Sequence, residues 1–346
     1  MRVRGLGRVK RYVRRMTAPF RSQAVILMYH RIFEASLDPW ELCVSPQNFS
    51  EHLEHLRRHY RVLTLPHLVR LLKTSELPKR AVVLTFDDGY ADNLWNAKPL
   101  LEHFDIPATV FVTTGYVGLN REFWWDELER IVLLTPQLPK SLELTLQGSR
   151  YTWELAEWAD RPVITGNMGV SEWGTLSNGK LTSRHKAYTD LHCLLRPLAH
   201  EERRTALARL RSDMGVSGNG RSTYRPLTLE EIPKLANGSL VEIGSHTVTH
   251  PVLSAQSMTI QRQEMVESKR SLEKVLGRPV TTFCYPYGDV NKTAVELPNE
   301  VGFDAACTTG GRTVTSGVNP CLLPRTFVGN WNGEEFAKRL SKIFTQ

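Results

Sequence analysis

The sequence has no long apolar run. Its longest apolar stretches, such as Val25–Met28 and Ala81–Leu84, are far shorter than the roughly 18 to 20 residues that a transmembrane helix needs. The N-terminus is positively charged, but it lacks both the apolar stretch of about 7 to 15 residues and the clear cleavage site of a secretory signal peptide. We therefore predict no transmembrane helix, no export and a cytoplasmic location.

Cysteine pairs of the kind that hold structural zinc are also missing. The five cysteines are an odd number, are widely spaced and include no C-x-x-C pair (Cys43, Cys193, Cys284, Cys307 and Cys321). This pattern fits a reducing compartment and argues against a structural zinc cluster. Internal repeats and low-complexity segments are absent as well.

Acidic residues are missing from the first 21 residues, which hold eight of the 44 Lys and Arg side chains. The rest of the chain has 36 basic and 36 acidic residues and is therefore neutral. Apolar residues in this arm recur at a nearly helical spacing, so two interpretations stay open. One is an amphipathic helix on the anionic inner face of a membrane, and the other is a solvated tail. No nucleic-acid partner is expected, because no other segment has a patterned positive charge.

The chain is rich in short apolar runs that alternate with helical patterns. V-I-L-M-Y-H, A-V-V-L-T-F and A-T-V-F-V-T-T read as strands, and the alternation resumes near Leu229. Continuous apolar strands of this kind belong to parallel sheets covered on both faces. The sequence therefore predicts an α/β fold, either a barrel or a doubly wound sheet.

The alternation is lost at about residues 115–226, which we interpret as an insertion. This segment contains five of the eight tryptophans (Trp124, Trp125, Trp153, Trp158 and Trp173). Flat aromatic rings can form a cap that shapes a sugar or lipid site. The alternative is that the tryptophans pack the small core of the insertion itself.

Two adjacent carboxylates, Asp87 and Asp88, end the apolar run A-V-V-L-T-F and precede Gly89. The bland interpretation is a turn followed by a helix cap. However, ligands of α/β folds bind at the carboxyl ends of the strands. The aspartate pair therefore lies where catalytic or metal-binding residues are expected.

A second predicted strand end, E-I-G-S-H-T-V-T-H, places His246 and His250 four residues apart. This spacing alone is weak, but two imidazoles and a carboxylate form the three-ligand set of a catalytic zinc with an open position. One aspartate can then bind the metal, while the other accepts a proton from water. Zinc is the favoured cofactor, with other divalent metals as alternatives.

T-F-D-D-G-Y followed by S-H-T-V-T-H resembles the polysaccharide deacetylase family with the NodB homology domain, carbohydrate esterase family four. The opening I-L-M-Y-H-R-I is similar to the members that begin with a Y-H-R strand. The resemblance implies a distorted (β/α) barrel at residues 24–346, preceded by the basic arm at 1–23 and interrupted by the insertion. It also implies that Asp87 is the catalytic base and that Asp88, His246 and His250 are the metal ligands.

The family motif R-x-P-Y-G reads C-Y-P-Y-G here, so Cys284 replaces the arginine that steadies the catalytic aspartate. The resemblance still assigns the Tyr287 backbone N–H to the oxyanion. Arg325, in L-P-R-T-F-V, is our candidate for the missing guanidinium. The family's late histidine acid is missing too, because no histidine follows His250. His30 is the candidate acid, and the alternative is a strand-end histidine bonded to backbone.

The resemblance implies a metal-dependent hydrolase that removes N-acetyl groups from an amino sugar, and we expect that sugar to be part of a polysaccharide, a glycan precursor or a lipid-linked sugar. The missing arginine and histidine leave a non-catalytic glycan-binding or assembly module as an alternative. Hydrolysis of a non-sugar amide by the same chemistry is a further alternative. The remaining histidines include His52, His55 and His59, which share a charged helical segment and are expected to be solvated.

Overall fold

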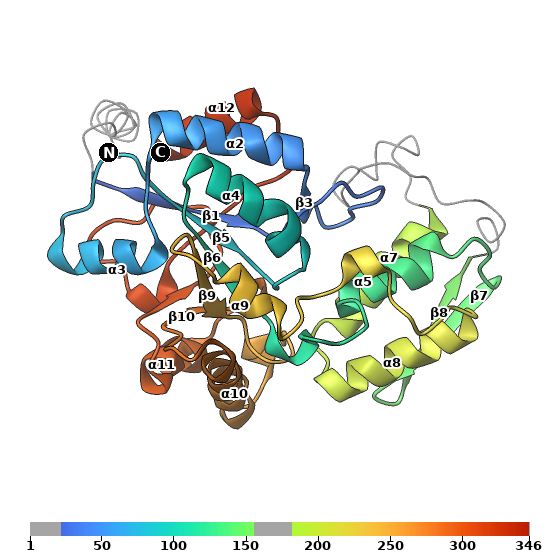
Figure 1. Ribbon diagram of the computed structural model, residues 1–346. Coiled ribbons are helices and arrows are strands. Elements are labelled where there is room, and N and C mark those ends of the chain that lie inside the picture. The colour runs from blue at the N-terminus through green and yellow to red at the C-terminus, as the bar shows by residue number, and fades with distance from the viewer. Residues whose placement is uncertain (1–21, 156–181, 346) are drawn as a thin grey trace, which may run out of the picture.

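The computed structural model describes residues 22–155 and 182–345, which form two lobes (Figure 1). The first lobe is an α/β unit that holds both described ends of the chain. The second is smaller and is built from the middle of the sequence. Within these residues, no helix has the length and the apolar character needed to cross a membrane. The predicted basic arm at residues 1–21 and the tryptophans Trp158 and Trp173 lie outside the described residues.

A parallel sheet of eight strands forms the centre of the larger lobe. Its order is β11-β10-β9-β6-β5-β1-β12, with the short β4 also paired to β5. The strands are β1 (Ala24–Tyr29), β4 (Arg61–Val62), β5 (Ala81–Phe86), β6 (Ala108–Val112), β9 (Val241–Ser245), β10 (Thr282–Cys284), β11 (Ala305–Cys307) and β12 (Thr326–Phe327). Every residue of β1, β5 and β6 is buried, as expected for parallel strands covered on both faces.

The sheet curls until its two edges meet. Leu323, three residues before β12, donates its N–H to the Ala306 carbonyl of β11 at 3.0 Å. Its own carbonyl accepts from the Thr308 N–H at 2.8 Å. The last strand thereby joins the edge formed by β11 to β1. The prediction of a distorted (β/α) barrel is confirmed.

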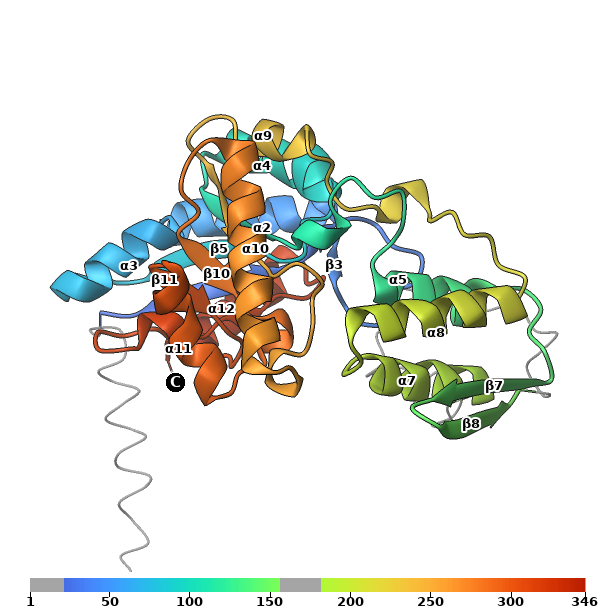
Figure 2. The same ribbon diagram turned by 90° about the horizontal axis from the view of Figure 1, so that it is seen from below.

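Helices pack around this sheet, with α2, α4 and α12 together on one side and α10 and α11 on another (Figures 1 and 2). Their bounds are α2 (Pro46–His59), α3 (Leu65–Thr74), α4 (Lys98–Phe104), α9 (Glu231–Leu235), α10 (Met258–Leu276), α11 (Lys292–Val301) and α12 (Gly333–Phe344). The sequence explains several of their ends. Ser45 and Ser257 accept bonds from backbone N–H groups at the starts of α2 and α10, and Gly277 ends α10 at a φ of 65°.

The smaller lobe consists of α5 (Trp124–Glu129), the hairpin β7 (Ser141–Leu146) and β8 (Ser149–Glu154), α7 (Ser183–Leu195) and α8 (His200–Asp213). The hairpin packs on α7 and α8 (Figure 2). Trp124, Trp125 and Trp153 are buried in the hydrophobic core of this lobe. The three described tryptophans of the insertion therefore do pack a core of its own.

Arg31 joins the two lobes. It follows β1 in the short β2 (Arg31–Ile32), which pairs with β3 (Cys43–Val44). Its guanidinium is buried, bonds the Asp92 carboxylate at 2.9 Å and lies over the rings of Tyr90 and Tyr224. It also donates to the Thr223 carbonyl at 2.6 Å. The chain leaving the first strand is thus anchored to the segment that leaves the insertion.

The prediction that His52 is solvated is wrong. His52 is buried, with one ring nitrogen 3.2 Å from the Tyr29 hydroxyl and the other 2.7 Å from the Trp331 carbonyl. It shares the buried face of α2 with Phe49, Leu53 and Leu56, because residues three and four apart lie on one face of a helix. The apolar spacing is readable in the sequence, but the charged neighbours of His52 led to its assignment to the solvated side.

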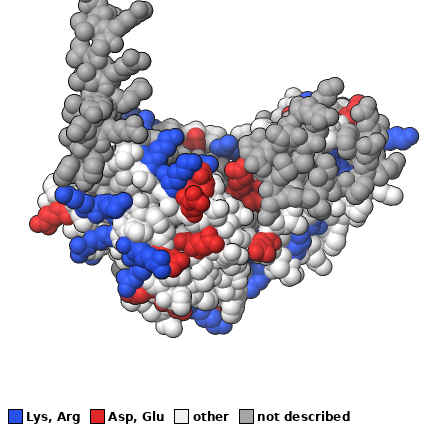
Figure 3. Space-filling view, turned by 90° about the horizontal axis from the view of Figure 1, so that it is seen from above, with Lys and Arg blue, Asp and Glu red and all other residues white. Residues whose placement is uncertain are grey.

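Charged side chains of both signs are interspersed on the face shown in Figure 3, where Lys and Arg alternate with Asp and Glu. This agrees with the balance of 36 basic and 36 acidic residues beyond the first 21.

Candidate metal centre and active site

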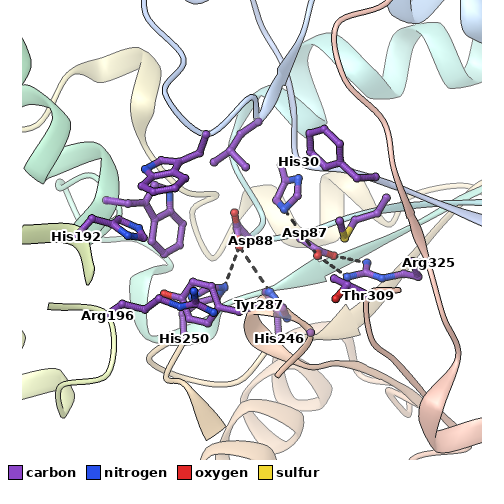
Figure 4. A pocket seen from close by; sticks show the side chains of 16 residues that line it. His30, Asp87, Asp88, His192, Arg196, His246, His250, Tyr287, Thr309 and Arg325 are labelled. Carbon is purple, nitrogen blue, oxygen red and sulfur yellow. Dashed lines mark hydrogen bonds and ion pairs between the residues drawn. The ribbon is translucent and has the colours of Figure 1, made fainter. Parts of the chain in front are cut away.

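Three side chains converge at the carboxyl ends of β5 and β9. Asp88 Oδ1 lies 3.6 Å from His246 Nε2 and 3.4 Å from His250 Nε2. All three residues are buried, and their ligand atoms lie within 4.8 Å of one another. Figure 4 shows the Asp88 carboxylate facing both imidazoles. The sequence motifs, 158 or more residues apart in the chain, thus meet at one point, as their strand ends require.

The donor set fits a divalent cation. His246 Nδ1 lies 2.8 Å from the Cys284 carbonyl, which leaves Nε2 free to bind and fixes the orientation of the ring. Burial lowers the pKa of both His246 and His250, so both rings are neutral, which is the form that binds metals. Burial and the neighbouring Asp87 charge raise the pKa of Asp88 well above its usual range. A cation at this point would relieve that repulsion.

The backbone is strained where it aims these side chains. Asp88, Thr247, His250 and Tyr287 have φ values of 71°, 65°, 55° and 59°. Non-glycine residues in this left-handed region cost about 1–3 kcal/mol each and cluster at functional sites. The next residue after Asp88 is Gly89, at a φ of 82°, where a Cβ atom would lie 3.1 Å from Val112. The turn after β5 therefore brings the chain close against β6.

Glu264 of α10 holds the loop that carries His250. Its carboxylate accepts from the N–H groups of Val248 and Thr249 at 2.7 and 2.8 Å and from the Thr249 hydroxyl at 2.6 Å. The Thr247 hydroxyl also accepts from the His250 N–H at 3.1 Å. These bonds turn the chain so that His250 returns to Asp88. Sequence reasoning missed Glu264, whose only signal is an acidic residue next to Met265 on the apolar face of α10.

Asp87, the neighbour of Asp88 in the chain, binds Arg325. The guanidinium donates to Asp87 Oδ1 and Oδ2 at 2.6 Å each, and both side chains are almost fully buried (0% and 5% exposed). Burial alone would raise the pKa of Asp87, but the Arg325 charge and its hydrogen bonds hold that pKa well below the usual range. Asp87 is therefore ionised, and Arg325 gives it the guanidinium partner that Cys284 cannot provide.

Cys284 completes the surroundings of Asp87. Its sulfur lies 3.7 Å from Asp87 Oδ2 and accepts from Arg325 at 2.9 Å. Burial raises the pKa of this thiol well above its usual value, although Arg325 opposes the effect. Asp87, His246 and Cys284 also bring three ligand atoms together. The guanidinium bonded to two of these three side chains disfavours a second cation there.

The burial of Cys284 gives a testable prediction. Of the five cysteines, only Cys193 is exposed, and a neutral buried thiol reacts poorly. We expect one thiol per folded chain to react with Ellman's reagent at pH 8, and five after denaturation. The Cys193→Ser variant should then show no reactive thiol when folded. Modification of Cys284 in the folded protein, identified by mass spectrometry, would contradict the assignment of a neutral thiol.

His30 lies on the other side of Asp87 from Arg325 (Figure 4). Its Nε2 is 3.9 Å from Asp87 Oδ2, and its buried Nδ1 has no hydrogen-bond partner. Burial lowers the pKa of His30 to about 4, against the opposing pull of the Asp87 charge. The ring is thus neutral near pH 7. In the described parts of the chain, the His30 ring has no hydrogen bond to a backbone atom, which argues against the alternative of a histidine bonded to backbone.

A cavity of about 320 Å³ opens over these groups. Both lobes line it, because Tyr287, Thr309 and Phe327 of the barrel face Trp125, His192 and Arg196 of the smaller lobe. Trp40 also lines the cavity, and its ring lies 4.0 Å from that of His192. Trp125 therefore serves both interpretations of the insertion, since it packs the core of the lobe and also shapes the cavity.

Comparison with known sequences finds a family model that matches two segments of the chain. The family model described as polysaccharide deacetylase matches residues 74–133 and 220–306. Over these two segments the chain is similar to the polysaccharide deacetylase family. The two matched segments contain Asp87, Asp88, His246, His250 and Tyr287, and they are separated by the insertion.

Individual deacetylases are also similar to this chain in sequence or in structure. The poly-β-1,6-N-acetyl-D-glucosamine N-deacetylase of Staphylococcus aureus is 33% identical over 110 residues, 28% of this chain and 38% of the relative. The alignment thus spans less than half of the relative's length. Among solved structures, the Streptococcus pyogenes deacetylase PplD is 20% identical, with a TM-score of 0.57 over 92% of this chain and 98% of that one. IcaB from Ammonifex degensii gives a TM-score of 0.55 at 17% identity, over 92% and 97%. These structures share the fold.

Proposed function

We propose that the chain is a divalent-metal-dependent hydrolase that removes N-acetyl groups from an amino sugar in a polysaccharide, a glycan precursor or a lipid-linked sugar. The observation that carries this proposal is the pairing of Asp88, His246 and His250 with an ionised Asp87 at the base of one cavity. Relatives named as N-deacetylases support the same reaction. Two imidazoles and one carboxylate favour zinc among the divalent metals.

A cation held by Asp88, His246 and His250 would polarise the amide carbonyl and make water more acidic at its open coordination position. Asp87 is the proposed base, since its carboxylate is ionised and held in position by two bonds from Arg325. We assign the developing oxyanion to the backbone N–H of Tyr287, at the cavity wall. The role of this N–H rests on the family resemblance and on the location of Tyr287.

His30 is the proposed acid for the leaving amine. Being neutral, it must first gain a proton, and Asp87 Oδ2, at 3.9 Å from His30 Nε2, can supply one after accepting it from water. The proton that Asp87 takes from water would pass to His30 and then to the amine nitrogen as the C–N bond breaks. This route leaves acetic acid, which ionises to acetate near pH 7, and a free amine, and it restores both side chains.

The role of His30 has a direct test. General acid–base groups contribute about 10²–10⁴-fold, so His30→Gln should lower kcat for acetate release by about 100-fold. The bound metal should remain, because His30 does not contact the metal ligands' donor atoms in the described structure. Full activity of the variant with an unchanged pH profile would reject His30 as the acid. His59→Gln, at an exposed position of α2, is the matched control.

The proposed function is tested by measuring acetate release from chitooligosaccharides, β-1,6-linked N-acetylglucosamine oligomers and a lipid-linked N-acetylglucosamine. We expect release of acetate and free amine in equal amounts, lost after chelation and restored by zinc. A protein that binds one zinc per chain yet releases no acetate from any of these would count against the proposal. The two bonds from Arg325 to Asp87 weaken one of the two arguments for a non-catalytic module, because they supply the guanidinium that Cys284 lacks.

A further inference from the structure

Arg196 is a cation in the wall of the cavity, on the opposite side of Asp88 from Arg325 (Figure 4). It directly follows α7 in the smaller lobe. Its guanidinium carbon lies 4.2 Å from the centre of the Tyr287 ring. The Tyr287 ring in turn lies 4.5 Å from the ring of His250. One aromatic ring therefore separates this charge from a candidate metal ligand.

The Arg196 side chain has no hydrogen-bond or ion-pair partner in residues 22–155 and 182–345. Its Nε atom is buried without an acceptor. Two other arginines of the smaller lobe are paired with carboxylates: Arg211 bonds Glu127 at 2.5 Å, and Arg221 bonds Glu122 and Glu129 at 2.7 Å. Arg121 and Arg184 also have buried nitrogens without acceptors. A partly buried charge without a partner is costly. Arg196 differs from Arg121 and Arg184 in lining the cavity over the metal centre, where a bound ligand can supply its partner.

The charges around the cavity indicate the sign of the charge that such a partner carries. Arg325 offsets Asp87, and a divalent cation would more than offset Asp88, so the charge of Arg196 is left in excess. His192 adds no second charge, because burial lowers its pKa to about 3 and Arg196 and Arg203 act in the same direction. The excess positive charge favours an anionic group on the ligand.

The cavity also offers surfaces for a sugar ring between the metal centre and Arg196. Trp40 and Trp125 both line it. Their orientations are fixed, since Trp40 Nε1 donates to the Tyr188 hydroxyl and Trp125 Nε1 to the Tyr90 hydroxyl, each at 2.7 Å. Rigid aromatic rings of this kind suit the apolar faces of a sugar. An N-acetyl group at Asp88 would leave the rest of the sugar directed along these rings.

We propose that the substrate carries an anionic group, a phosphate or a carboxylate, next to the N-acetylated sugar and that Arg196 binds this group. The inference rests on the proposed function and adds the substrate class. Arginine forms charge-assisted hydrogen bonds with both anions, so the two sources are separated by experiment. Arg196 is then a specificity-determining residue that contacts substrate away from the reacting bond.

The test compares three N-acetylglucosamine compounds: the neutral methyl glycoside, the 1-phosphate and a disaccharide with glucuronic acid. We expect kcat/KM for at least one charged compound to exceed that for the methyl glycoside by about tenfold or more. Arg196→Gln should remove most of this preference, and Arg196→Lys should retain part of it. Preference for the 1-phosphate identifies phosphate as the bound group, and preference for the disaccharide identifies carboxylate.

Arg209→Gln is the matched control. Arg209 belongs to α8 of the same lobe, its side chain is 61% exposed, and its loss should leave the preference unchanged. Equal kcat/KM for all three compounds, or an equal fall for all three in Arg196→Gln, would overturn the inference and leave deacetylation intact. If the wild type releases no acetate, the proposed function fails. Quenching of tryptophan fluorescence then measures binding of the 1-phosphate and the methyl glycoside, and equal affinities would overturn the inference separately.

Discussion

Replacing Asp87 with Asn is expected to lower kcat for acetate release by about 10³-fold. The amide cannot accept the proton of the attacking water, while the three candidate metal ligands are unchanged. Asp87 contacts Arg325 and lies near His30, and it is not a member of the group formed by Asp88, His246 and His250. We therefore expect the variant to bind zinc in the same stoichiometry as the wild type, as measured by elemental analysis and calorimetry.

Asp88→Asn is the informative partner of this variant. It changes the adjacent carboxylate, which approaches His246 and His250 rather than Arg325, and it should weaken metal binding. If the two variants behaved in the opposite way, with metal lost in Asp87→Asn and kept in Asp88→Asn, the roles of the two aspartates would be exchanged. Circular dichroism should accompany both measurements, because Asp87→Asn leaves the Arg325 charge unpaired.

Replacing Arg325 with Ala is expected to lower the free energy of unfolding by about 3–5 kcal/mol, the usual cost of breaking a buried ion pair. In this variant the Asp87 side chain would stay buried but would lose both hydrogen bonds from the guanidinium. Its pKa should then rise, so that less of the base is ionised and kcat falls as well. Denaturation in urea measures the first effect and acetate release the second. The metal content should not change.

Arg325→Lys separates charge from geometry. Lysine retains the positive charge but cannot donate to both oxygens of Asp87 in a planar fork. We expect intermediate stability and intermediate kcat. A double-mutant cycle with Asp87→Asn then isolates the pair, because the doubly substituted protein has neither buried charge. Loss of metal in Arg325→Ala would show that Arg325 supports the metal ligands instead of Asp87.

Much of the fold and of the metal centre could be predicted from sequence because both rest on regular local signals. The buried strands are continuous apolar runs, and parallel strands place their carboxyl ends at one edge of the sheet. The two motifs at these ends therefore had to meet. Arg325 was proposed on the same basis, as a basic residue near a predicted strand, and the structure places it on Asp87.

The rest of the site depends on contacts that no local pattern encodes. Glu264 and Arg196 act across loops and between lobes, where the partner is set by tertiary packing. His52 was assigned to solvent because charged residues surround it in sequence, although its helix turns it toward the core. The insertion showed as a loss of the β-α alternation and as a concentration of tryptophans. Its helices and hairpin could not be placed over the cavity without coordinates.

The closure of the sheet by Leu323 and β12 has a consequence for folding order. The bonds between Asp87 and Arg325 join residues 238 positions apart. Such a contact can form only after nearly the whole chain has been brought together, and long-range contacts of this kind are slow to form. A folding intermediate in which the first strands and the metal ligands are already native would still lack the contact of Arg325 with Asp87. The rate at which activity recovers during refolding would therefore be set by the pairing of the last strand with the sheet and not by the assembly of the cation site.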